Sequence, residues 1–175
     1  AIAEGRQLFR NLKLSFAYLI MVHVPLVATA ALVPFLGFPL LYLPVHIVWL
    51  ELIIHPTALL VFQQAPPEAE LAPASRRSQT QFFDVREWTL LVAVGGMTTA
   101  LIMFGYYFSL GPERDVLHAR SVAMVALVIA SATVAAALSG LRSRSAAIAV
   151  GATILSALLI VQTPQLATLV HMSPL

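Results

Sequence analysis

The sequence predicts an all-α protein, a polytopic helical membrane bundle of about five transmembrane helices with its N-terminus in the cytoplasm. Of its 175 residues, 59% are hydrophobic and only 10% are charged, and the mean hydropathy is +0.88. A soluble domain carries about 25% charged residues, so lipid must replace water around this chain and a soluble enzyme is disfavoured. The apolar residues also gather into stretches of about 20, the length that crosses a bilayer as a helix.

Five segments qualify as membrane spans by length and composition. They are residues 14–36, 39–62, 88–110, 117–138 and 146 to about 170. Residues 37–39 are the only link between the first two, which predicts a tight helical hairpin, and Pro164 interrupts the last span. We expect four parts: a cytoplasmic stalk, an ion-site hairpin, a cytoplasmic linker and supporting transmembrane helices. Their bounds are 1–13, 14–62, 63–87 and 88–175.

Arginine and lysine indicate the orientation, because they are retained on the cytoplasmic side of a membrane. Eight of the ten fall on one side of the predicted topology: Arg6, Arg10, Lys13, Arg76, Arg77, Arg86, Arg142 and Arg144. Arg114 and Arg120 lie near the third-to-fourth connection on the other side. We therefore expect a cytoplasmic N-terminus in an integral protein of the cytoplasmic (inner) membrane of a bacterium. An odd number of spans suggests a piece of a longer protein.

Composition also excludes several kinds of site. The chain has no cysteine, which rules out disulfides, thiolate metal ligands and cysteine nucleophiles. A net charge of +2 is too small for a nucleic-acid partner. The expected surroundings are therefore the lipid bilayer and other parts of a membrane protein.

Three ionisable residues lie near the middle of the first two spans. An ionisable side chain at the bilayer centre costs ~2.5 to 3.5 kcal/mol on insertion scales, so it calls for a reason. Glu51 lies almost at the midpoint of the second span, His55 follows one helical turn later on the same face, and His23 lies near the midpoint of the first. At ~1.5 Å per residue, the three occupy one slab of the membrane. The pattern predicts a cation or proton site formed by Glu51, His55 and His23.

Two prolines strengthen this prediction. Pro56 follows His55 and cannot bond the carbonyl of Leu52, and Pro25 leaves the carbonyl of Met21 in the same state two residues after His23. Each helix is expected to kink or open there. Opened turns inside a membrane line cavities or ion sites.

The sequence is also compatible with purely structural roles for the same residues. Glu51 would also serve as a protonated carboxyl bonded to a neighbouring helix, and His55 or His23 as a packed polar residue. Three histidines near span ends are assigned to the interface rather than to a site: His46, His118 and His171. Small residues at helix-packing spacing predict close helix contacts. They are Gly95, Thr99, Ala132, Ala136 and Gly140.

Residues 4–68 resemble the fifth and sixth transmembrane helices of P-type cation-transporting ATPases. The matching features are Glu4-Gly5-Arg6, Asn11, Lys13, Pro44-Val45-His46, Trp49 and Pro66-Pro67-Glu68. Beyond Trp88 the resemblance is mainly one of topology, so the chain is similar to the C-terminal transmembrane region, the fifth to ninth helices, of that family.

The resemblance also shows departures. Where calcium pumps carry ligands, this sequence has Glu51, Ile54 and His55 on the sixth helix, His23 and Leu26 on the fifth, and Ser131 on the eighth. Calcium prefers six to eight oxygens with several carboxylates, so calcium is not the expected cargo. One carboxylate with two imidazoles suits a proton, or a transition metal such as zinc or manganese, and the sequence does not separate them.

For the full-length pump the resemblance implies ATP and Mg²⁺, an aspartate that is phosphorylated in a cytoplasmic domain, and motions that reach the ion site through residues 1–13. This chain contains no Asp-Lys-Thr-Gly-Thr phosphorylation motif. We therefore expect no catalytic residue and no cofactor in this chain, and expect the preceding helices and the cytoplasmic ATPase domains as partners. The alternative is a structural or partner-binding helical membrane protein without transport activity. A channel or secondary transporter is disfavoured because no inverted repeats are evident.

Overall fold

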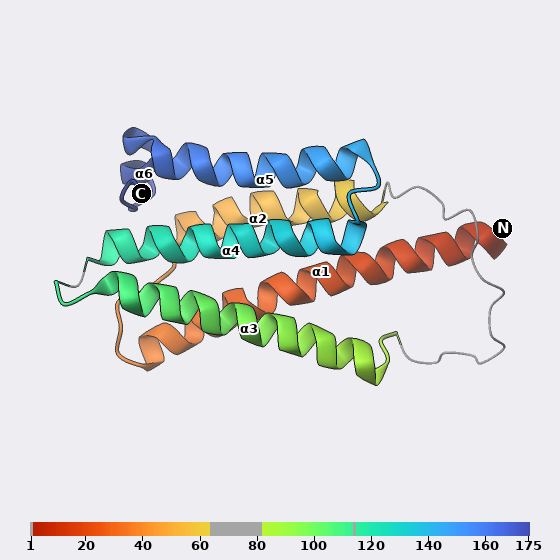
Figure 1. Cartoon of the computed structure of the whole chain (residues 1–175), viewed down its shortest axis with the longest axis horizontal. Coiled ribbons are helices and arrows are strands. Elements are labelled where there is room, and N and C mark those ends of the chain that lie inside the picture. Colours follow the sequence, from red (N-terminus) through yellow and green to blue (C-terminus); the bar gives the residue numbers. More distant parts are fainter. Residues whose placement is uncertain (1, 64–81, 114) are drawn as a thin grey trace.

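The computed structural model describes residues 2–113 and 115–175 apart from 64–81, and its regular structure is helical throughout (Figure 1). The helices are α1 (Ile2–Phe35), α2 (Pro44–Ala58), α3 (Val85–Leu110), α4 (Val116–Ser139), α5 (Arg144–Gln162) and α6 (Pro164–Leu169), and α2 continues into the π-helical turn η1 (Leu59–Gln63). Within these residues, five helices are long and apolar enough to span a membrane, when α2 and η1 are taken together. The predicted helical membrane bundle is confirmed.

The five long helices run alternately up and down, so their ends gather at two poles of the bundle (Figure 1). The start of α1, the end of η1, the start of α3 and the α4–α5 loop meet at one pole, which we call the basic end. Its basic residues in the described chain are Arg6, Arg10, Lys13, Arg86, Arg142 and Arg144. The loop from α1 to α2, the α3–α4 connection and α6 lie at the opposite pole. This grouping matches the topology that the charge pattern predicts.

The first connection is longer than predicted. Residues 36–43 form a loop, and α2 begins at Pro44 instead of residue 39. Side chains of later helices hold the loop open: Tyr106 Oη donates to the carbonyl of Pro39 at 2.8 Å, and Arg120 donates twice to the carbonyl of Leu40, at 3.0 and 2.9 Å. The carbonyls of Pro39 and Leu40 thus have hydrogen-bond partners although they lie outside a helix, as a membrane protein requires.

The prolines act differently from one another. α1 stays one helix through Pro25 and Pro34, and α2 continues through Pro56 to Ala58 before its winding changes to that of a π-helix at Leu59. In place of the predicted opening beside His55, the winding changes at Leu59, four residues after His55. Pro164 separates α5 from α6, as predicted.

α4 is the centre of the bundle, since it contacts α1, α2, α3 and α5. Its inner face carries small residues such as Ala119, Ala123 and Ala135, all fully buried, which lets the neighbouring helices approach closely. Large apolar residues on the outer faces are exposed, among them Leu52, Met97 and Ile148. Such exposed apolar faces suit contact with lipid or with other membrane helices.

Candidate cation site

The structure brings the three predicted site residues together. Nε2 of His23 on α1 lies 3.3 Å from Oε1 of Glu51 on α2, and Nδ1 of His55 lies 2.7 Å from Oε2 of the same carboxylate. The two imidazole rings stand nearly edge to face, with centroids 5.9 Å apart and an angle of 74° between the planes. The carboxylate of Glu51 therefore lies between two imidazoles from two helices.

Helix geometry explains half of this arrangement. Glu51 and His55 are four residues apart on one helix, so their side chains meet on one face of α2. His23 comes from the neighbouring α1, at the depth that the two spans predict. Leu50 and Ile54, on the adjoining face of α2, are buried in the bundle core, which fixes the rotation of α2.

A hydrogen bond to the backbone determines which ring nitrogen of His23 carries a proton. Its Nδ1 lies 2.9 Å from the carbonyl oxygen of Leu19, one turn earlier on α1. A carbonyl accepts and never donates, so Nδ1 carries the proton in this bond. In a neutral imidazole the other nitrogen, Nε2, is then an acceptor, and it faces the Glu51 carboxylate.

The site lies at the edge of the described bundle. The side chains of His23 and Glu51 are about one-third exposed, at 33% and 35%, and that of His55 is 58% exposed. Oε2 of Glu51 is nevertheless shielded and accepts no directed hydrogen bond within the described residues, although His55 Nδ1 is close to it. The carboxylate is thus in contact with both imidazoles, and its oxygen that faces His55 is closed to solvent.

The cluster is compact, but it is not an open chelate. Among the residues that the structure describes, no three histidine, aspartate or glutamate side chains are arranged so that they could hold a metal ion. Both imidazoles approach the carboxylate itself, at 3.3 and 2.7 Å, and do not surround a common centre. Binding a metal would require these side chains to separate.

His46 is not an interfacial residue solvated by water. Its side chain is fully buried where α2 begins. Its Nδ1 accepts from the backbone amide of Leu43 at 3.1 Å, and its Nε2 donates to the carbonyl of Val170 at 2.6 Å. The imidazole thus joins the start of α2 to the end of α6, so the predicted solvated position is wrong and His46 is a buried structural link.

Sequence reasoning missed two buried hydroxyl pairs. Tyr18 Oη lies 2.8 Å from Ser131 Oγ, which joins α1 to α4, and Thr57 Oγ1 lies 3.2 Å from Thr153 Oγ1, which joins α2 to α5. The available signal was their register, because Tyr18 and Thr57 follow the spacing of the buried residues on their helices. Leu26, which the sequence resemblance aligns with a calcium-pump ligand, is buried in the apolar core.

Comparison with known proteins agrees with this architecture. The sequence family described as "Cation transporting ATPase, C-terminus" matches residues 39–175, which include Glu51 and His55 but not His23. Neither a curated protein nor a solved structure matches the chain. The family match covers most of the chain, including the helices beyond Trp88 where the resemblance in sequence is weakest. The chain therefore belongs to the family of the C-terminal membrane region of cation-transporting ATPases.

Proposed function

We propose that this chain supplies part of the transport site of an ATP-driven cation pump, and that its cargo at this site is a proton. Glu51 is the residue that carries the proton, and His23 and His55 are the groups that exchange it. The chain is an integral membrane protein of the cation-transporting ATPase family. The transport site at Glu51 and the proton as the transported ion are what we propose.

The observation that carries the proposal is the contact between His23 Nε2 and Glu51 Oε1 at 3.3 Å. Nδ1 of His23 is committed as a donor to the carbonyl of Leu19. Two bare acceptors would repel each other, so a favourable contact needs one proton between Nε2 and Oε1, on the carboxyl or on the imidazole. The geometry therefore supports a site that takes up and releases a single proton.

Two further observations favour a proton over a metal ion. The described side chains offer no group of three that could hold a metal. Ser131, where calcium pumps have a carboxylate, is only 3% exposed and is bonded to Tyr18. One carboxylate between two imidazoles suits proton exchange, because histidine titrates near physiological pH.

The exposed side of the cluster supports the expected partnership with other helices. A carboxylate and two imidazoles open to acyl chains would be costly, so the preceding helices of a complete pump would cover this side. α1 is a continuous helix from Ile2 to Phe35. A displacement of its first turns by the ATPase domains would therefore be transmitted along a rigid element to His23.

The test is Glu51→Gln in the complete pump. The amide keeps the size of the side chain but cannot exchange a proton, so we expect loss of proton transport and of the ATP hydrolysis coupled to it, with normal membrane insertion. Glu113→Gln, at an exposed position between α3 and α4, is the matched control. Both activities are measured in proteoliposomes with a pH-sensitive dye and a phosphate-release assay.

The competing function is structural, with Glu51 as a hydrogen-bonding link between α1 and α2. Glutamine would serve that role, so proton transport at the wild-type rate in Glu51→Gln would reject the proposed site. Zinc or manganese stimulation of ATP hydrolysis at constant pH, with no change of lumenal pH, would assign the site to a metal ion.

A further inference from the structure

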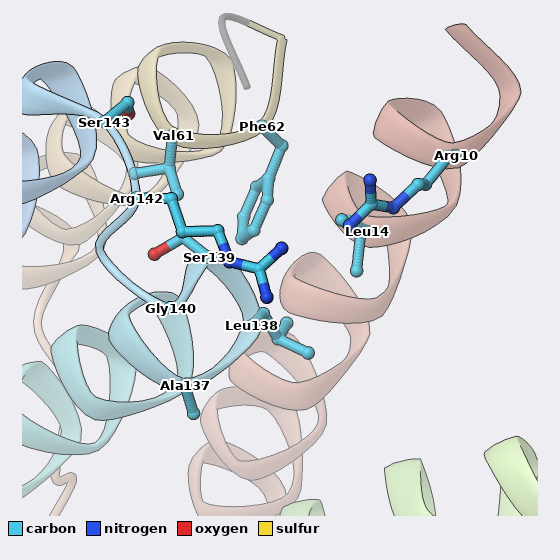
Figure 2. A pocket seen from close by; sticks show the side chains of 10 residues that line it. All are labelled: Arg10, Leu14, Val61, Phe62, Ala137, Leu138, Ser139, Gly140, Arg142 and Ser143. Carbon is cyan, nitrogen blue, oxygen red and sulfur yellow. The ribbon is translucent and has the colours of Figure 1, made fainter. Parts of the chain in front are cut away.

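A second polar site lies at the basic end, away from the three residues described above. A cavity of about 140 Å³ is enclosed by α1, η1, the end of α4 and the α4–α5 loop (Figure 2). A single water molecule needs about 10–15 Å³ of such cavity volume, so the cavity has ample room for a small polyatomic group. A phosphate group has that size.

Two cationic side chains converge on this cavity. Arg10 extends from α1 and Arg142 from the α4–α5 loop, and both guanidinium groups point into the space between these elements (Figure 2). Of the described residues that line the cavity, none is acidic. Two cationic groups that point into one space can both attract an anion placed between them.

Both arginines also interact with other parts of the chain. A guanidinium has five N–H donors in a planar fork, so it can keep one partner and still donate two hydrogen bonds to a phosphate. Ser143 lines the same cavity and caps α5 by accepting from the amide of Ala146 at 3.1 Å. The positive end of the α5 dipole therefore adds to the field of the arginines.

The position of the cavity identifies the source of the phosphate. It lies at the pole where basic residues flank the membrane spans, and the buried ring of Phe62 together with Leu14 gives it apolar walls. Basic pockets between transmembrane helices on the cytoplasmic side suit the head groups of anionic lipids, whose acyl chains continue along apolar helix faces. We infer that this cavity binds the phosphate group of an anionic phospholipid through Arg10 and Arg142.

The experiment is native mass spectrometry of the full chain released from bilayers of phosphatidylglycerol and phosphatidylcholine in equal amounts. We expect phosphatidylglycerol to be retained in preference, and Arg10→Gln or Arg142→Gln to lower its retention about fivefold each. Arg86→Gln removes the same charge at the same pole but outside the cavity lining, so it should leave retention unchanged. Equal losses in all three variants, or no preference between the lipids, would overturn the inference.

Two further arms address folding and the source of the phosphate. Arg142→Lys keeps the charge but lacks the planar fork, so reduced retention with an unchanged thermal midpoint supports a bidentate site even when the glutamine variants misfold. Inorganic phosphate at millimolar concentration should not displace the lipid. Displacement by inorganic phosphate would assign the cavity to a soluble anion and overturn the lipid assignment.

Discussion

Gly95 of α3 lies against Val24 of α1, so closely that a side chain on the glycine would press on the valine. A Cβ added to Gly95 would lie 3.0 Å from Cγ1 and 3.2 Å from Cβ of Val24. The second atom is tied directly to the backbone of α1, so a rotamer change cannot relieve the clash. Val24 lies between His23 and Pro25, and this helix crossing therefore helps to fix the position of His23.

Relative to Gly96→Ala, Gly95→Ala should lower the stability of the bundle by about 1 to 3 kcal/mol, because Val24 and its helix must give way to the added Cβ. Gly96→Ala is the matched control, since its added Cβ meets no atom within 4 Å. Both variants gain about 1 kcal/mol of helix propensity, so their difference in thermal unfolding reports the clash alone. Equal unfolding midpoints would show that α1 and α3 are not in tight contact.

The Tyr18–Ser131 bond gives a second prediction. Tyr18→Phe and Ser131→Ala each remove one hydroxyl and leave the other buried without this partner. The double variant removes both, so its cost should be smaller than the sum of the single costs, with a coupling of about 0.6 to 2 kcal/mol. Unfolding in detergent with a chemical denaturant measures the cycle, and additive costs would contradict the bond.

The site shows how far sequence reasoning reaches. The spacing of Glu51 and His55 and the depth of His23 could be derived from helix periodicity and rise, and the structure brings all three together. The rotation of α1 about its axis could not be derived, because it depends on contacts such as that between Val24 and Gly95. The tautomer of His23 could not be derived either, because it follows from the distance between Nδ1 and the carbonyl oxygen of Leu19.

The loop of residues 36–43 shows the opposite case. Its apolar sequence reads as the start of a membrane helix, and hydropathy alone predicts a three-residue turn. What keeps it extended is tertiary: Arg120 and Tyr106 bind its carbonyls, and both are far away in the sequence. Such hydrogen bonds leave no periodic signal in the segment that they hold. The proposed division of residues 63–87 as a linker falls largely on 64–81, outside the described residues.

Tyr42, in this loop, predicts a pH dependence of stability. Burial raises the pKa of Tyr42 to about 12, and the hydrogen bond with Thr29 opposes this shift in part. In the unfolded chain the tyrosine hydroxyl ionises near pH 10. The stability that comes from burying the neutral phenol is therefore fully present below pH 10 and is lost as the pH rises through about 12. The midpoint temperature of thermal unfolding should therefore fall more steeply between pH 8 and pH 12 for the wild type than for Tyr42→Phe. Parallel curves would show that the phenol is not buried.

His46 predicts a change in stability without a change in transport. Its imidazole satisfies the amide of Leu43 and the carbonyl of Val170 together. Leucine leaves these two partly buried backbone groups without this partner, so His46→Leu should cost about 1 to 3 kcal/mol. His118→Leu is the control, because His118 is half-buried at the start of α4.

His46→Gln keeps one donor and one acceptor and should recover part of the loss, as measured by thermal unfolding. Transport per folded molecule should match the wild type in all three variants, because His46 joins α2 to α6 at the opposite pole from the basic end. A selective loss of proton transport in His46→Gln, with normal stability, would instead place this imidazole on the proton pathway.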